Sequence, residues 1–395
     1  MSVKFSEEEK YLLVLIKAAL SGGQAIGAEK PVNINMVLEI AQKHSVLSIL
    51  YDELQQMSVT EEQQILVDKY CRQITLQNYR LLFLTKYLLE LLQQNQIPSL
   101  VLKGVATASW YPVPELRKSG DVDLLIPKQV KMEKVGEVLK ASGFVEKMQQ
   151  HANYHMEFLS SEGITVEIHT EFTERFAYKK INAAMEKQVQ EGFASGIIAN
   201  AMGVELPVLN RAYHAYELIL HMLHHFTTSG FGLKLLCDWV VCWKQEWTHT
   251  EKECFYQLTE ESATRRFAEA VTEVCVAYLG MKRENFAWEY DATRIPGREL
   301  MREILDAEEF GENDTNRMVM MSGMGPGAYM KELHHQMHLN FPKAGKCFLL
   351  WPGLWVITLV RFLRNNKRVR NTSTKEVLQE AKRRSRLMKE LRLFQ

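Results

Sequence analysis

The 395-residue sequence predicts an α+β protein that is mostly helical. Apolar residues recur at helical spacing over most of the chain. Only the middle part, residues 96–210, adds short segments whose apolar residues alternate or run together as they do in strands. With 46% apolar and 24% charged residues, the composition is that of an ordinary soluble globular protein, long enough for two or three domains.

The first part of the chain is predicted to be helical throughout. Apolar residues at helical spacing indicate helices over residues 6–20, 33–56 and 61–95. After Pro98, the apolar run at 99–102 predicts a strand that leads into Lys103 and Gly104. Residues 105–110 then form the expected helix after this turn.

Two aspartates begin the next predicted strand, which reads Asp-Val-Asp-Leu-Leu-Ile from Asp121. Side chains alternate along a strand, so Asp121 and Asp123 project from the same face. The apolar residues that follow are typical of a buried strand beside a loop. A helix is expected at 128–142 with a strand after it, and a further strand at 164–169 carries Glu167.

Asp121, Asp123 and Glu167 are the candidate metal ligands. Three carboxylates on adjacent strands match what two magnesium ions need to hold a nucleoside triphosphate and prepare a hydroxyl for in-line attack, with manganese as the alternative metal. The competing interpretation places the aspartates at a solvated loop end and Glu167 on the wet face of an edge strand. His169 shares a strand face with Glu167 and is expected to support the ligands.

Beyond residue 211 the chain is predicted to be helical again. The clearest helices cover residues 212–226, 233–245, 250–261 and 264–279. His221, His224 and His225 share one helix face, as do His334 and His338. The first cluster has no cysteine or acidic residue at zinc-ligand spacing, so we interpret these histidines as polar residues that line a cleft.

The central motif resembles that of the nucleotidyltransferase superfamily with the DNA polymerase β type of fold. Its signature is a glycine turn, a strand with two acids around one residue, and a third acid on a later strand; Gly104, the Asp121 and Asp123 pair, and Glu167 match it. More narrowly, the chain resembles the uncharacterised nucleotidyltransferases over roughly residues 5 to 330. The matching segments are 103–104, 116–117, 120–125, 167–169 and 221–225.

This resemblance implies both an architecture and an activity. A small mixed-sheet core at 96–210 would be flanked by helical domains at 1–95 and 211–330, the second forming a wall of the cleft, and followed by a tail at 331–395. The implied reaction moves a nucleoside monophosphate from a nucleoside triphosphate to a hydroxyl and releases pyrophosphate. The expected nucleotide-binding residues are Lys103, Gly104, Arg117 and Gly120. The acceptor stays open among a small molecule, a protein and an RNA end.

One departure from the superfamily pattern lies directly after the glycine. The superfamily usually has a serine there that helps to hold the triphosphate, whereas this chain has Val105, and the nearest hydroxyls are Thr107 and Ser109. Lys103 is therefore expected to supply the charge for the phosphates, with Lys118 as a further candidate. The alternative is a catalytically degenerate protein that binds a nucleotide or a partner without turnover.

The C-terminal tail combines an apolar run with basic residues. Residues 347–363 are strongly apolar, but Pro352 and Gly353 interrupt the run, and it is too short to span a membrane. Residues 361–395 hold twelve Lys or Arg and three Asp or Glu, a net charge of plus nine. Packing against the helical domain or a second copy is the expected outcome, and peripheral membrane contact through 347–392, nucleic-acid binding and a purely tethering role are the alternatives.

Cysteine usage bears on the compartment. The six cysteines form no CxxC pair, and the N-terminus does not have the pattern of a signal peptide, so a reducing cytoplasm is expected. The glycine cluster at 323–327 follows no strand and is interpreted as a connector instead of a nucleotide loop. The oligomeric state is left open.

Overall fold

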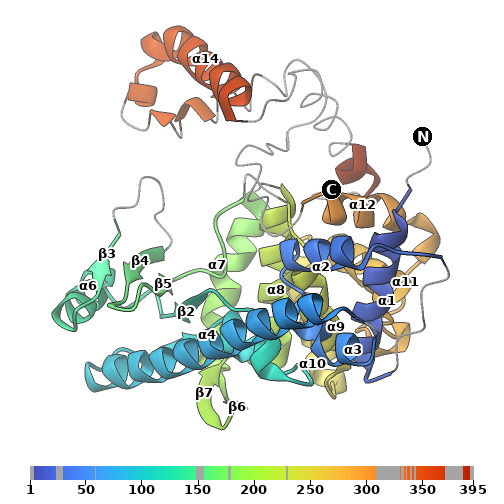
Figure 1. Cartoon of the computed structure of the whole chain (residues 1–395). Helices are drawn as coiled ribbons and strands as arrows, with labels where there is room; N and C mark the ends of the chain where they lie inside the picture. Colours follow the sequence, from blue (N-terminus) through green and yellow to red (C-terminus); the bar gives the residue numbers. More distant parts are fainter. Residues whose placement is uncertain are drawn as a thin grey trace.

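A seven-stranded mixed sheet lies beside a larger group of helices in the computed structural model of the chain (Figure 1). This confirms the predicted fold class, α+β and mostly helical. The structure describes residues 4–23, 30–57, 59–147, 155–176, 179–227, 230–307, 330, 333–334, 336–338, 340–341, 344–369 and 386–391. The glycine cluster at 323–327, His335 and most of the tail after residue 369 lie outside the described residues.

The sheet has the strand order β3-β4-β5-β2-β1-β7-β6. Its strands are β1 (Leu100–Val101), β2 (Asp121–Leu125), β3 (Val145–Glu146), β4 (His155–Leu159), β5 (Thr165–His169), β6 (Ile197–Ala201) and β7 (Val204–Val208). The central strand β2 pairs in parallel with β5 and antiparallel with β1, while β4 and β6 pair antiparallel with β5 and β7. Both directions therefore meet at the strand that carries the two aspartates.

Alternation along β2 gives the sheet one apolar and one polar face. Val122 and Leu124 are buried in a core that the sheet shares with helices α4 (Glu61–Gln94) and α6 (Met132–Ala141). Asp121 and Asp123 project from the opposite face. The helix predicted at 128–142 begins at Met132.

The N-terminal helices are α1 (Glu7–Ser21), α2 (Ile34–Lys43), α3 (Tyr51–Gln55) and α4. The single helix predicted over 33–56 is wrong, because α2 ends at Lys43 and Ser45 takes a left-handed φ of 56°. His44, which follows α2, accepts the backbone N–H of Leu233 at its Nδ1 (3.3 Å). The break thus coincides with a contact to the C-terminal helices, which local helical spacing does not encode.

The C-terminal helices are α7 (Lys179–Ala194), α8 (Arg211–Thr227), α9 (Leu233–Lys244), α10 (His249–Glu261), α11 (Arg265–Leu279) and α12 (Gly297–Ala307). One apolar core joins buried residues of α1 and α2, such as Leu12 and Val37, to the fully buried Trp239 and Trp243 of α9. The N-terminal helices therefore share a core with the helices after residue 211. The expected domain boundaries stay a prediction.

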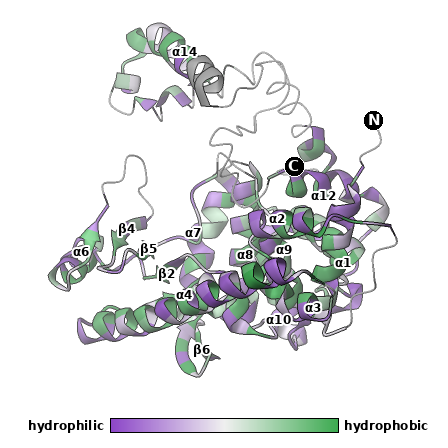
Figure 2. Cartoon of the chain, in the orientation of Figure 1, coloured by the Kyte–Doolittle hydropathy of each residue, from purple (hydrophilic) through white to green (hydrophobic). Residues whose placement is uncertain are grey.

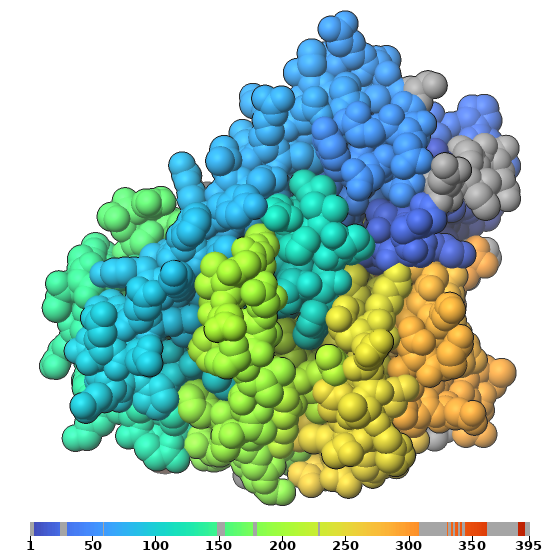
Figure 3. Space-filling view, turned by 90° about the horizontal axis from the view of Figure 1, so that it is seen from below, coloured from blue at the N-terminus to red at the C-terminus, as the bar shows by residue number. Residues whose placement is uncertain are grey.

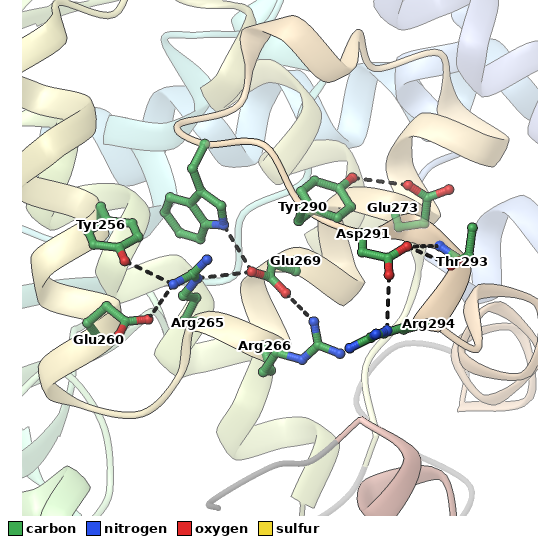
Figure 4. A network of polar contacts seen from close by, with 11 residues as sticks. Tyr256, Glu260, Arg265, Arg266, Glu269, Glu273, Tyr290, Asp291, Thr293 and Arg294 are labelled. Atoms are coloured by element: carbon green, nitrogen blue, oxygen red, sulfur yellow. Dashed lines mark hydrogen bonds and ion pairs between the residues drawn. The ribbon is translucent and has the colours of Figure 1, made fainter.

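A polar network holds the segment after α11 against α10 and α11 (Figure 4). Glu269, whose side chain is 2% exposed, accepts from Arg265 Nε (3.0 Å), Arg266 Nη1 (2.7 Å) and Trp288 Nε1 (3.1 Å). Tyr290 donates its hydroxyl to Glu273 (3.1 Å). The network holds Trp288 and Tyr290, in the segment after α11, against that helix.

Four parts of the structure had no counterpart among the predicted elements: β4, α7, the β6–β7 hairpin and α12. The hairpin lies beside α4 on the face seen in Figure 3, where the blue atoms of α4 meet its yellow-green atoms. Its strands extend the sheet next to β1. The middle part of the chain therefore holds more sheet than the alternation pattern indicated.

The last long helix, α14 (Trp351–Val369), follows the short 3-10 turn η6 (Phe348–Leu350). Within the described residues, no helix has the length and apolar character that a membrane crossing would need. All six cysteines are free thiols. The reducing compartment expected from them stays a prediction.

Candidate active site

The register of β2 and β5 brings two of the predicted acids side by side. The parallel pairing sets Asp123 opposite Glu167, and Asp121 opposite Thr165. Ligand atoms of Asp123, Glu167 and His169 all lie within 4.8 Å of one another. Asp121 is outside that group, although it lines the same pocket. The polar face of the sheet therefore gathers the predicted acids with His169 among them.

His169 lies between the two acids. Its Nε2 is 2.9 Å from Asp123 Oδ1 and 3.2 Å from Glu167 Oε2. Burial alone would lower the pKa of His169, but the hydrogen bonds to these two carboxylates raise it to about 9. The imidazole is therefore protonated at neutral pH. The sequence predicted a supporting role, and the structure places the ring in direct contact with both acids.

Lys103, two residues after the end of β1, approaches the same carboxylate. Its Nζ is 3.4 Å from Asp123 Oδ1, and its side chain is 17% exposed. Burial would lower the pKa of Lys103, but Asp123 and Glu217 outweigh it, so the pKa is raised above its ordinary value. Lys103 is thus a fixed positive charge that lines the pocket.

The two aspartates have opposite pKa shifts. Burial would raise the pKa of Asp123, but Lys103 and His169 lower it below its ordinary range. The charge of Asp123 and then burial raise the pKa of Asp121 to about 6. When two carboxylates lie close together on one face, their pKa values move apart, because the ionised carboxylate disfavours ionisation of the other. Asp123 is the permanently charged member of the pair.

Gly104 provides the predicted turn between β1 and the short helix α5 (Lys103–Ala108). Its φ of 52° and ψ of −120° interrupt the helix in a region that glycine adopts and other residues avoid. Its carbonyl accepts Arg117 Nη1 at 3.2 Å. Gly104 thus sets the change of backbone direction between β1 and α5.

Arg117, predicted to bind phosphate, forms a buried ion pair with Asp238 on α9. Arg117 Nε and Nη2 lie 2.8 and 2.7 Å from the two carboxylate oxygens of Asp238. Tyr111 donates to the same carboxylate at 2.7 Å. Arg117 thus ties the loop before β2 to α9. A contact of Arg117 with phosphate stays a prediction.

The acids form the floor of a pocket of about 490 Å³. Its walls come from the 117–121 loop and from α8 and α9. From these helices the lining residues are Leu218, His221, His224, His225, Lys234, Leu235 and Asp238. Burial lowers the pKa of His225 to about 3 and lowers that of His221 as well, so both rings are neutral. The histidine cluster thus lies in the cleft, as the sequence predicted.

The hydroxyls nearest to Gly104 in sequence do not line this pocket. Thr107 Oγ1 lies 3.0 Å from His214 Nε2, and Ser109 donates to the carbonyl of Ala106. Ser119, which sequence reasoning missed, does line the pocket, and its Oγ accepts Arg117 Nη1 at 2.8 Å. Its signal was its place directly before Gly120 and the aspartates.

Glu217 on α8 is a further residue that the sequence did not single out. It is fully buried, and neither of its carboxylate oxygens has a hydrogen-bond partner among the described residues. Burial raises the pKa of Glu217 to about 8, although Lys103 opposes the shift. The only signal was a glutamate inside an otherwise apolar helical segment. The carboxyl is therefore largely protonated at neutral pH, behind the charged face of the sheet.

These features agree with a comparison against protein families. Residues 30–280 match the model of the uncharacterised nucleotidyltransferase family. The match contains every predicted ligand and the whole pocket, and it covers more than half of the chain. The chain belongs to this family of nucleotidyltransferases.

Three solved structures show a distant similarity to parts of the chain. The lincomycin-bound lincosamide antibiotic adenylyltransferase LnuA is 14% identical, with 46% of this chain and 96% of that chain covered and a TM-score of 0.25. The antibiotic-resistance factor ANT(2'')-Ia is 9% identical, with 46% of this chain and 92% of that chain covered and a TM-score of 0.32. An antigenic nucleotidyltransferase-like protein from Paracoccidioides brasiliensis is 16% identical, with 51% of this chain and 93% of that chain covered and a TM-score of 0.30. No curated protein matches the chain.

Proposed function

We propose that the protein is a metal-dependent nucleotidyltransferase that moves a nucleoside monophosphate from a nucleoside triphosphate, such as ATP, to a hydroxyl acceptor and releases pyrophosphate. One observation carries the proposal. The parallel register sets Asp123 opposite Glu167 on the floor of a 490 Å³ pocket whose rim carries lysines. Carboxylates on neighbouring strands beneath a cationic rim suit a metal-bound polyphosphate.

The donor set fits divalent metal. Asp123 and Glu167 offer carboxylate oxygens within 4.8 Å of each other, and Asp121 adds a third carboxylate on the same face. Carboxylate oxygens suit both magnesium and manganese. We assign Asp121, Asp123 and Glu167 as the residues that would hold two magnesium ions. When bound, the metal neutralises the triphosphate and lowers the pKa of the acceptor hydroxyl.

The chain's own residues would orient the two substrates. Lys103, which already lies 3.4 Å from Asp123, and Lys118 and Lys234 at the rim would pair with phosphate oxygens. Gly104 and Gly120 would let the triphosphate approach the backbone. Glu167 would accept the proton of the attacking hydroxyl. The wall made by α8 would select the acceptor, whether a small molecule, a protein or an RNA end.

Calorimetry of each nucleoside triphosphate with magnesium tests the site. The native chain is expected to bind one nucleotide, and a variant with Asp121→Ala and Asp123→Ala is expected to lose that binding while its circular dichroism stays unchanged. A matched control replaces two exposed acids of α6, Glu133→Ala and Glu137→Ala, and is expected to bind like the native chain. Equal binding by the double aspartate variant would refute the assignment.

A second function, nucleotide binding without turnover, is favoured by the residues after Gly104. Val105 is buried and Thr107 is turned toward His214, so the superfamily's serine has no substitute at those positions. Pyrophosphate release, measured with candidate hydroxyl acceptors or water, separates the two functions. Binding in every case without pyrophosphate would favour the non-catalytic protein.

A further inference from the structure

The region around α14 exposes an unusual number of large apolar side chains. Seven of them between residues 348 and 360 are 43% to 74% exposed. They are Phe348, Leu349, Leu350, Val356, Ile357, Leu359 and Val360, which together are called the α14 apolar face. Isolated exposed apolar residues are normal in soluble proteins, but a cluster this dense marks an interaction surface. Green residues along the first turns of α14 in Figure 2 show the same concentration.

The opposite side of α14 already has partners. Leu354 and Thr358 are buried, four residues apart on one side of the helix. Trp355 donates its Nε1–H to His334 Nδ1 at 3.3 Å, and Trp351 donates to the carbonyl of Gly345 at 2.6 Å. These contacts anchor one side of α14 on the segment before it. The α14 apolar face is therefore the side that points away.

Positive charge follows this face directly in sequence. Arg361 ends the apolar run, and residues 361–395 carry the net charge of plus nine. Arg361 lies over the ring of Phe341, with 4.9 Å from its guanidinium carbon to the ring centroid. The sequence after Arg361 stays basic, with Arg364 and Lys367 four and seven residues after Val360. An apolar face that continues into basic sequence matches the boundary between acyl chains and anionic headgroups.

We propose that the α14 apolar face docks on the surface of an anionic phospholipid bilayer, with α14 lying along the interface. The apolar side chains would enter the region between headgroups and acyl chains, and Arg361 at the end of the apolar run would contact the phosphates. The docking would hold the nucleotidyltransferase at the membrane without a spanning helix, which agrees with the described helices.

Charge also argues against a second copy as the occupant of this face. Two α14 apolar faces packed on each other would bring together two tails of net charge plus nine, and like charges oppose that contact. An anionic bilayer instead neutralises them. The attraction is then weakened by salt, because Arg361 is exposed.

Flotation of the full chain with vesicles tests the proposal. Binding is expected with vesicles of phosphatidylcholine and phosphatidylglycerol, and much less with phosphatidylcholine alone. A variant with Ile357→Asp and Val360→Asp is expected to bind at least about tenfold more weakly, because charges replace side chains that enter the lipid. Raised salt is expected to weaken binding of the native chain.

A matched control carries the same change on another exposed apolar surface, Ile65→Asp and Phe83→Asp on α4, whose side chains are 61% and 63% exposed. It is expected to float like the native chain. Failure of the native chain to float, or equal flotation of the α14 variant, would overturn the proposal. So would self-association in ultracentrifugation that the α14 variant abolishes while vesicle binding is absent. Nucleotide binding serves as the separate readout of the active site.

Discussion

At the scale of single residues, the candidate site is a balance of buried charges. Asp123 faces Lys103 at 3.4 Å and His169 at 2.9 Å, while Glu217 lies behind them without a hydrogen-bond partner among the described residues. A buried carboxyl without such a partner favours its neutral form. Glu217 is therefore the residue of this group whose protonation should couple most visibly to folding.

The pKa of Glu217 predicts a pH-dependent stability. Its folded-state pKa of about 8 lies above the ordinary 4.5, so the stabilisation is complete below that ordinary value and is lost as pH rises through about 8. Glu217→Gln keeps a neutral side chain at every pH. Between about pH 5 and pH 8, the native chain should lose free energy of unfolding relative to this variant, by at most about 5 kcal/mol. Urea unfolding at several pH values measures this difference.

A parallel pH dependence for the two proteins would show that Glu217 ionises normally in the folded chain. The exposed Glu133→Gln on α6 is the control, and its unfolding free energy should follow that of the native chain at each pH.

The ion pair between Arg117 and Asp238 predicts a large stability effect. Their side chains are 6% and 0% exposed, so Asp238→Ala would leave the guanidinium buried without its main partner. We expect a loss of about 3 to 5 kcal/mol in the free energy of unfolding. Arg117→Lys should have a lower free energy of unfolding than the native chain, because an ammonium cannot make the bidentate contact. A loss below about 1 kcal/mol for Asp238→Ala, measured by urea unfolding, would contradict this account.

Sequence reasoning reached some of these residues because their information is local. Strand alternation was enough to place Asp121 and Asp123 on one face, and Glu167 with His169 on another strand. Glu217 on α8 and Asp238 on α9 lie more than 90 residues after the aspartates. Their position depends on how helices pack on the sheet, which the spacing of apolar residues does not specify.

At the scale of elements, most predicted helices and the two acid-bearing strands agree with the structure within a few residues. The helix predicted over 33–56 failed because α2 ends at Lys43, where the next residue, His44, contacts the distant Leu233. The β6–β7 hairpin was missed although Met202 and Gly203 form its turn with positive φ values. Local turn chemistry was thus present in the sequence, but its sheet partner, β1, lies about 100 residues earlier.

The polar network on α11 predicts how much the carboxylate of Glu269 contributes to stability. Glu269→Ala removes the acceptor of Arg265, Arg266 and Trp288 at once. Both arginine side chains are about 30% exposed and can be hydrated, so we expect a loss near 2 kcal/mol instead of the value for a fully buried pair. Thermal unfolding with a fluorescence probe of the tryptophans measures it. Glu260→Ala, an exposed partner of Arg265, should cost less than about 1 kcal/mol.

At the scale of the whole molecule, the proposed function places the nucleotide between the sheet and the C-terminal helices. The sheet supplies the acids from its core with α4 and α6, while α8 and α9 supply the opposite wall from the larger helical core. A ligand that contacts both walls binds the folded chain and not the unfolded one. Its binding energy must then appear as added stability of the whole chain.

The last prediction uses this linkage. Magnesium and the correct nucleoside triphosphate together should raise the unfolding temperature, by an amount that corresponds to about 2.7 kcal/mol when the free nucleotide is a hundred times its Kd. The nucleotide without magnesium should give a smaller shift, because the carboxylates and the phosphates repel each other without the metal. Magnesium without the nucleotide should also give a smaller shift. The Asp121→Ala and Asp123→Ala variant should show no rise in unfolding temperature with magnesium and nucleotide together at the same concentrations. An equal shift in that variant would mean that the nucleotide stabilises the chain at some place other than the acids of β2.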